Sequence, residues 1–279
     1  MDDILIFGCG DLGTGLGRRL HDAGHRVWGL RRHPEHLPEW IHPLRGDLSD
    51  PDGLPELPRT ARAVYFITTP DRMDDAGYRR AYVDALHHAL GALERQGLQP
   101  ERVIFVSSTG VYGVDDGSRV DEDTPALPQR FSGRRLLEAE RLLEASPYRG
   151  IRLRLGGIYG PGRERMLDLA RAGQLGDDEP PTWTNRIHRD DAVGILHHLF
   201  TLADPDPVYL GVDTEPALKS EVLHWLAARL GTLPADAAVH RVDARDGARG
   251  RRCDSRRLQD SGYRFRYPDY RAGFAPLLP

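Results

Sequence analysis

The sequence predicts an α/β fold in which a doubly wound parallel sheet is followed by a small C-terminal substrate lobe. Strand-sized apolar runs such as DILIFG and RVIFVSST alternate with amphipathic helical runs through the first two thirds of the 279 residues. A glycine-rich turn, GCGDLG, joins the first strand to the first helix. Beyond about residue 160 the chain is richer in Pro, Gly and Arg and less periodic, which indicates a separate and smaller lobe.

The expected elements follow one another as a parallel sheet with crossover helices requires. Strands are expected at 3–8, 25–32, 41–48, 61–70, 102–109, 150–162 and 207–213, and helices at 13–24, 76–97, 132–146 and 221–231. The first helix ends at Gly24, because glycine readily takes the left-handed conformation of a helix end. We therefore expect a main domain at 1–160 with a returning segment at about 186–212, and a substrate lobe made of 161–185 and 213–279.

Composition and charge indicate an ordinary globular protein of the cytoplasm, without membrane contact. Hydrophobic residues make up 39% of the chain and charged residues 29%, and the formal net charge is −4. Every apolar run is too short to span a bilayer, and the chain begins almost directly with a strand rather than with an export signal. Cys9 and Cys253 do not have the spacing of metal ligands, so no metal site is expected.

The turn GCGDLG, residues 8–13, has the pattern of a dinucleotide-binding loop because it follows a strand and opens a helix. Gly8 permits the tight turn, Gly10 lets the backbone approach a pyrophosphate, and Gly13 allows the helix to pack closely on the sheet. Asp11 and Leu12 complete the loop at the positive end of the helix, where phosphates bind. The main domain is therefore predicted to be an NAD(P)-binding Rossmann domain.

The end of the second strand indicates which dinucleotide is bound. Arg31 and Arg32 stand where a carboxylate would select NAD, and guanidinium groups suit the 2′-phosphate of NADP. We expect NADP, with NAD as the alternative if both arginines are solvated loop residues. Asp47 is predicted either to contact the adenine amino group or to form a turn. Thr68 and Thr69 follow the fourth strand and are expected near the cofactor ribose or pyrophosphate.

The motifs GCGDLG, VSSTGVYG, LRLGGIYGPGR, NRIHRDD and SGYRFRYPDY occur in a characteristic order. With them the chain resembles the extended short-chain dehydrogenase/reductase superfamily, in particular the NAD-dependent epimerase/dehydratase-like proteins and their YeeZ-like, or atypical, branch. The resemblance implies that Ser108 binds the substrate oxygen and that a Tyr, with a Lys four residues later, acts as general acid and base. Those two positions are Ser132 and Leu136 here, and 113–147 contains neither Tyr nor Lys.

Tyr112 is a candidate to replace the missing proton donor, with Arg134 or Arg135 lowering the pKa of its phenol. The alternative is an aromatic side chain that packs where the fifth strand leaves the sheet. Ser107 is expected at the cofactor site. The resemblance places Tyr159 near the nicotinamide, as a residue that lines the pocket rather than reacts.

Basic residues in the last motifs are candidates for substrate binding. Arg163 and Arg186 are plausible anchors for an anionic substrate such as a nucleotide diphosphate, or they bridge the lobes through carboxylates. His188 is a candidate proton carrier. Asp190 and Asp191 begin a helix and are predicted to cap it. The predicted substrate-binding residues are Arg134, Arg163, Arg186 and His188.

Two classes of function follow from these residues. The first is an NADP-dependent reductase, epimerase or dehydratase that acts on a carbohydrate-like or nucleotide-sugar substrate and lacks the usual Tyr/Lys pair. The alternative is a non-catalytic NADP(H)-binding redox sensor or scaffold, as a monomer or a homodimer. Nucleic acid is not an expected partner, because Asp243, Asp246 and Asp254 dilute the charge of the arginine-rich segment 243–253.

Overall fold

The computed structural model describes residues 1–176, 180–234 and 247–279, so Asp243 and Asp246 of the arginine-rich segment lie outside the described residues. The chain forms two compact units. The first unit comprises Met1–Tyr112, Ala126–Arg154 and Val193–Tyr209, and the second comprises Gly113–Pro125, Leu155–Ala192 and Leu210–Pro279. The second unit thus includes 113–125, 155–160, 186–192 and 210–212, which were expected in the main domain.

A seven-stranded sheet has the order β11-β7-β5-β4-β1-β2-β3, and most of its residues belong to the first unit. Its strands are β1 (Asp3–Phe7), β2 (Arg26–Arg31), β3 (Ile41–Arg45), β4 (Ala61–Phe66), β5 (Arg102–Ser108), β7 (Gly150–Leu155) and β11 (Val208–Gly211). β1 pairs with β2 and β4 in parallel, and the β2–β3 and β4–β5 pairs are parallel too. The doubly wound α/β fold is therefore confirmed, and the carboxyl ends of these strands share one edge of the sheet.

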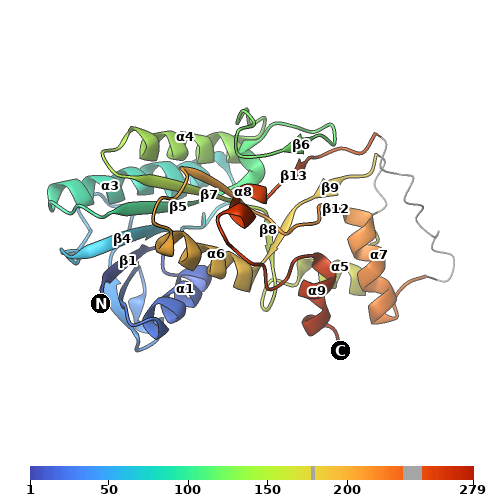
Figure 1. The fold of residues 1–279 in the computed structure, drawn as a ribbon, viewed down its shortest axis with the longest axis horizontal. Helices are drawn as coiled ribbons and strands as arrows, with labels where there is room; N and C mark the ends of the chain where they lie inside the picture. The colour runs from blue at the N-terminus through green and yellow to red at the C-terminus, as the bar shows by residue number, and fades with distance from the viewer. Residues whose placement is uncertain (177–179, 235–246) are drawn as a thin grey trace. The chain divides into compact units, whose positions relative to one another are not determined.

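Helices cover both faces of this sheet: α3 and α4 lie on one face, and α1 and α6 lie on the other (Figure 1). These helices are α1 (Asp11–Asp22), α3 (Ala85–Arg95), α4 (Phe131–Ala145) and α6 (Arg189–Thr201). A further short helix, α2 (Asp75–Tyr78), precedes α3. Tyr65 of β4 reaches α6, where its hydroxyl donates a hydrogen bond to the Leu196 carbonyl at 3.0 Å. Gly24 follows α1 with φ of +86°, as its predicted role requires.

One long helix is expected at 76–97, but the structure divides it. A π-helical segment, Arg79–Asp84, joins α2 to α3. The Thr68 hydroxyl donates a hydrogen bond to the Ala81 carbonyl at 2.7 Å inside this segment. Such a bulge leaves carbonyls without their usual helical partner, and a side chain from the β4 exit supplies one here. Helical periodicity alone does not reveal a bulge of this kind.

Within its described residues, the second unit contains three two-stranded sheets and four further α-helices. The pairs are β6 (Arg119–Val120) with β13 (Arg252–Cys253), β8 (Gly157–Tyr159) with β10 (Arg186–His188), and β9 (Trp183–Thr184) with β12 (Ala217–Leu218). The helices are α5 (Arg165–Arg171), α7 (Lys219–Leu230), α8 (Arg256–Asp260) and α9 (Tyr270–Phe274). Leu167, Leu223, Leu226 and Phe274 belong to the apolar core that α5, α7 and α9 share.

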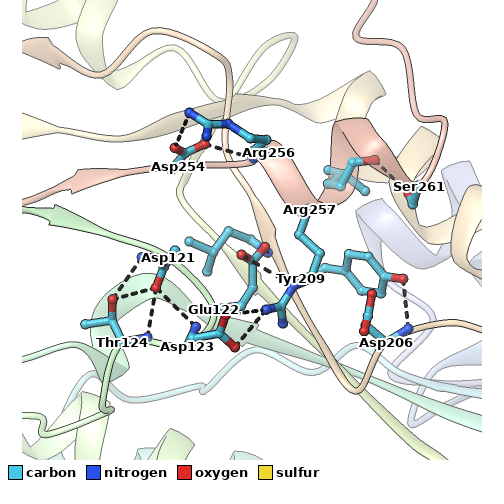
Figure 2. A network of polar contacts seen from close by, with 12 residues as sticks. Asp121, Glu122, Asp123, Thr124, Asp206, Tyr209, Asp254, Arg256, Arg257 and Ser261 are labelled. Carbon is cyan, nitrogen blue, oxygen red and sulfur yellow. Dashed lines mark hydrogen bonds and ion pairs between the residues drawn. The ribbon is translucent and has the colours of Figure 1, made fainter.

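Figure 2 shows how the excursion 113–125 is tied to α8 inside the second unit. The Arg257 guanidinium donates to both carboxylate oxygens of Asp123 at 2.7 Å. Glu122 is buried and accepts a hydrogen bond from the Leu210 amide at 2.8 Å, while burial raises the pKa of its carboxyl group. Among the described residues, no helix has the length and apolar character needed to cross a bilayer.

Candidate functional site

The glycine loop between β1 and α1 has the geometry of a phosphate-binding loop. Gly8 has φ of +77°, and a Cβ there would collide with the Ile67 carbonyl oxygen, so only glycine fits. A Cβ on Gly13 would lie 3.1 Å from Cγ2 of Ile6, which shows how closely α1 approaches β1. The Cβ position of Gly10 is open, because its nearest neighbour is the Gly8 carbonyl oxygen at 3.9 Å.

This loop fits a dinucleotide. Gly10 is the N-cap residue of α1 and makes no side-chain cap, and Asp11 after it is exposed whereas Leu12 is buried. The open space at Gly10 therefore stands in front of the helix N-terminus, where backbone amides and the helix dipole favour a pyrophosphate. The backbone of Gly10 to Gly13 would hold the phosphates, as the sequence predicts.

Charged side chains surround the ends of β2 and β3. Arg31 ends β2 and is half-buried, and Arg32 is exposed. The Arg32 guanidinium donates to both carboxylate oxygens of Asp71 at 2.8 and 2.9 Å. The Asp47 carboxylate accepts hydrogen bonds from the Ser49 amide and hydroxyl. The hydrogen bond from the amide lowers the pKa of Asp47. Of the two interpretations of Asp47, these contacts favour the turn.

The exit of β4 brings two threonines to the same edge. Thr68 directs its hydroxyl to Ala81, and its methyl group faces Gly8, where it would lie 3.0 Å from an added Cβ. Its side chain thereby supports the loop and the π-helical segment. Thr69 is exposed. Of the two predicted contacts with the cofactor ribose or pyrophosphate, the exposed Thr69 is the one whose side chain is open to a ligand.

Ser108 ends β5 and caps the 3-10 turn Thr109–Val111. Its Oγ accepts a hydrogen bond from the Gly110 amide at 3.1 Å, which leaves the hydroxyl proton for a substrate oxygen. A Cβ on Gly133 would collide with the Gly110 carbonyl oxygen, so the first turn of α4 packs directly on this 3-10 turn. Ser132, at the position of the family's tyrosine, lies in that first turn.

A buried polar network lies behind this edge of the sheet. The Arg154 guanidinium donates to both oxygens of Glu140 at 3.0 and 2.6 Å and to the Tyr112 hydroxyl at 2.7 Å. The Ser107 hydroxyl donates to Glu140 at 2.6 Å, so this side chain binds the protein interior rather than a cofactor. Burial alone would lower the pKa of Arg154, but the hydrogen bonds and ion pair with Glu140 raise it above its ordinary value.

The cation beside Tyr112 is therefore Arg154, and the expectation of Arg134 or Arg135 is corrected. Arg134 is exposed and donates to the Gln129 carbonyl at 3.1 Å. Arg135 pairs with Asp75 and Glu138, each at 2.8 Å. Tyr112 is only 2% exposed. A phenol buried to this extent and bonded to a guanidinium favours the packing interpretation over a catalytic role.

The other predicted site residues belong to the second unit. Arg186 is 5% exposed and Asp213 is 1% exposed. Nη1 of Arg186 donates to Thr184, but within the described part of the chain its Nε and Nη2, and both carboxylate oxygens of Asp213, are buried without a hydrogen-bond partner. Burial raises the pKa of Asp213 to about 7, against the attraction of Arg186. The ring of Tyr270 packs against the Arg186 guanidinium, with its centroid 5.4 Å from Cζ.

His188 and Tyr159 pack against each other, with ring centroids 5.3 Å apart. His188 is buried, its Nδ1 accepts a hydrogen bond from the Asp190 amide at 3.1 Å, and burial lowers its pKa. The Tyr159 hydroxyl donates to the Asp269 carbonyl at 3.4 Å. Asp191 accepts hydrogen bonds from Tyr263 and from the amides of 266 and 267, so it anchors that segment. The side chains around His188 and Tyr159, and those around Asp191, thus serve to hold the second unit together.

The structure thus gathers the glycine loop, the two arginines, Asp47, the two threonines and Ser108 at one edge of the first unit. Tyr159, Arg163, Arg186 and His188 lie in the second unit, and Arg163 is exposed there. Sequence reasoning missed Asp71, Glu140, Arg154 and Asp213. Two signals were available: Asp71 follows a strand exit directly, and Asp213 follows the apolar run PVYLGV. Among the described residues, no group of three or more His, Cys, Asp or Glu could hold a metal ion.

Fold and loop together define a Rossmann-type, dinucleotide-binding protein. Residues 4–200 match the NAD dependent epimerase/dehydratase family, and the chain belongs to this family. It is similar to Protein YeeZ of Escherichia coli (strain K12), with 28% identity over 96% of this chain and 97% of that protein.

Two solved structures are similar to this chain over nearly their whole lengths. A protein from Methylobacillus flagellatus, named for the NAD-dependent epimerases/dehydratases, is 38% identical with a TM-score of 0.83, and 99% of this chain and 97% of that one are covered. MoeE5 in complex with UDP-glucuronic acid and NAD is 25% identical with a TM-score of 0.78, and the coverage is 98% and 96%.

Proposed function

We propose that the protein is an NADP(H)-dependent oxidoreductase, epimerase or dehydratase that acts on a carbohydrate-like or nucleotide-sugar substrate without the usual Tyr/Lys pair. The observation that carries this proposal is the open space at Gly10, at the start of α1, on the same sheet edge as the Ser108 hydroxyl, whose oxygen accepts a hydrogen bond from the Gly110 amide. A bound nicotinamide supplies hydride chemistry. The chain's own part is to hold the phosphates on the glycine loop and to polarise the substrate oxygen through Ser108.

The substrate class is supported by the relative that binds a nucleotide sugar, MoeE5. The preference for NADP(H) is supported by Arg31, a half-buried guanidinium at the end of β2, with NAD as the alternative. Arg186 and His188 lend no support to the substrate class, because both side chains are buried.

A non-catalytic redox sensor or scaffold is the second candidate function. Two residues favour it, because neither matches a group of the usual proton relay. Ser132 stands at the position of the Tyr, and the buried Leu136 stands at the position of the Lys. Tyr112 is committed to Arg154. A sensor requires different affinities for reduced and oxidised cofactor, because only differential affinity shifts a conformational equilibrium. Equal affinities for NADPH and NADP, together with no change in binding partners, would exclude this candidate.

Ser108→Ala tests the catalytic proposal. Once a panel of UDP-sugars with NADP or NADPH has identified a reaction by product mass and absorbance at the nicotinamide band, the variant should lower kcat about 10²-fold. The loss follows because a hydrogen-bond donor to the reacting oxygen is removed. Ser118→Ala, at an exposed serine of the second unit, is the control and should react at the wild-type rate. Equal rates in all three proteins would show that Ser108 does not take part.

A further inference from the structure

The strands that flank β1 send charged residues past its end. β1 lies between β2 and β4, and its Phe7 is level with Leu30 on one side and Phe66 on the other. Neighbouring strands are about 4.8 Å apart, so the ends of β2 and β4 are separated by roughly 10 Å. Arg32 follows β2 and Asp71 follows the β4 exit, and an arginine side chain is long enough to bridge that separation.

Arg32 and Asp71 meet with the geometry of a strong ion pair. Both terminal nitrogens of Arg32 donate, at 2.8 and 2.9 Å, to the two oxygens of Asp71. The hydrogen bond to Asp71 raises the pKa of Arg32 and lowers that of Asp71. The charges of Asp47, after β3, and Arg80, in the π-helical segment, also act on this pair. The bidentate arrangement occupies both terminal nitrogens, which a phosphate would also use.

The ion pair therefore crosses the end of the strand that carries the glycine loop. A dinucleotide held on that loop extends its adenosine toward the end of β2. A 2′-phosphate at this position would find Arg32 already paired with Asp71, and the negative charge of Asp71 would repel it. A ribose with a free 2′-hydroxyl carries no such charge and has less need of the Arg32 guanidinium.

We propose that Asp71 is a specificity-determining residue, which withholds Arg32 from the 2′-phosphate of NADP(H) and so narrows the preference for NADP(H) over NAD(H). The inference rests on the proposed function, because it concerns the cofactor that the glycine loop holds. According to this proposal, Arg31 attracts the 2′-phosphate in every case, and Arg32 contributes only when its ion pair with Asp71 is broken.

Calorimetric titration of the cofactor-stripped full chain with NADPH and with NADH tests the proposal. Asp71→Asn should tighten NADPH binding about three- to tenfold and change NADH binding less than about twofold, because an ion pair and a like charge are removed together. The gain should shrink in about 1 M salt, which screens exposed charges. Asp52→Asn, at an exposed aspartate in the loop after β3, is the charge-matched control and should leave both affinities unchanged.

A second variant separates release of Arg32 from simple repulsion by Asp71. In an Arg32→Gln background, Asp71→Asn should lose most of its effect, since no guanidinium remains to be released. If Asp71→Asn gives the same NADPH-to-NADH affinity ratio as the wild type and Asp52→Asn, the specificity role is wrong while the proposed function stands. If the wild type binds neither dinucleotide, the proposed function and this inference fail together.

Discussion

Replacing Glu140 with alanine should lower the free energy of unfolding by about 3 to 5 kcal/mol, because it leaves a buried guanidinium without its counter-charge. Glu140 is 1% exposed and binds two nitrogens of Arg154 and the Ser107 hydroxyl. Removing the carboxylate abandons all three donors in a medium that cannot solvate them. Urea unfolding followed by circular dichroism measures the change.

Glu138→Ala is the matched control for this measurement. Glu138 lies on the same helix and pairs with Arg135 at 2.8 Å, but its side chain is 43% exposed. An exposed pair contributes at most about 1 kcal/mol, so this variant should remain close to the wild type. Glu140→Leu combined with Arg154→Met should recover much of the loss, because no isolated charge stays buried. Equal losses for Glu138→Ala and Glu140→Ala would contradict the account of the network.

The free energy of unfolding should fall as the pH rises from about 4 to about 7, and Asp213→Asn should remove much of that fall. Asp213 has a pKa of about 7 in the folded protein, compared with an ordinary value of 3.8. The folded protein therefore binds the proton more tightly than the unfolded chain does. The contribution is fully present below about pH 4, and it is lost as the pH rises to about 7.

The size of the Asp213 effect follows from the pKa difference. At about 1.4 kcal/mol for each pKa unit, the loss amounts to roughly 4 kcal/mol when Asp213 is ionised. At pH 8, Asp213→Asn should thus unfold at a higher urea concentration than the wild type, and near pH 4 the two should be similar. Asp260→Asn, at an exposed aspartate of α8, should keep the wild-type pH dependence. If the free energy of unfolding of Asp213→Asn changes with pH as it does in the wild type, Asp213 is already ionised in the folded protein at neutral pH.

The backbone of the first unit could be predicted from the sequence because it depends on patterns that are local. Apolar runs of strand length and a glycine loop at a strand-to-helix turn identify a doubly wound sheet without knowledge of any long-range contact. The two-residue strands of the second unit could not be predicted, since a pair such as Arg252–Cys253 is too short to show a period. Their pairing depends on partners distant in the sequence.

The side-chain partners of the site were the least predictable part. Arg134 and Arg135 were expected beside Tyr112 because they are close to it in sequence, but the buried face of α4 is made by other residues, among them Leu136 and Glu140. Arg154 reaches that face from β7 and meets Tyr112 there. The Arg32–Asp71 pair joins residues 39 positions apart, and only the strand order brings them together.

The most direct test of the central claim is calorimetric titration of the cofactor-stripped protein with NADPH, for the wild type and for Gly10→Ala. The account predicts micromolar binding by the wild type and affinity weakened by about tenfold or more in the variant, because the added methyl group fills the space open to a pyrophosphate. Both proteins should unfold at the same temperature, and Gly91→Ala in α3 should bind like the wild type. Failure of the wild type to bind any nicotinamide dinucleotide, or equal affinity in Gly10→Ala, would contradict it.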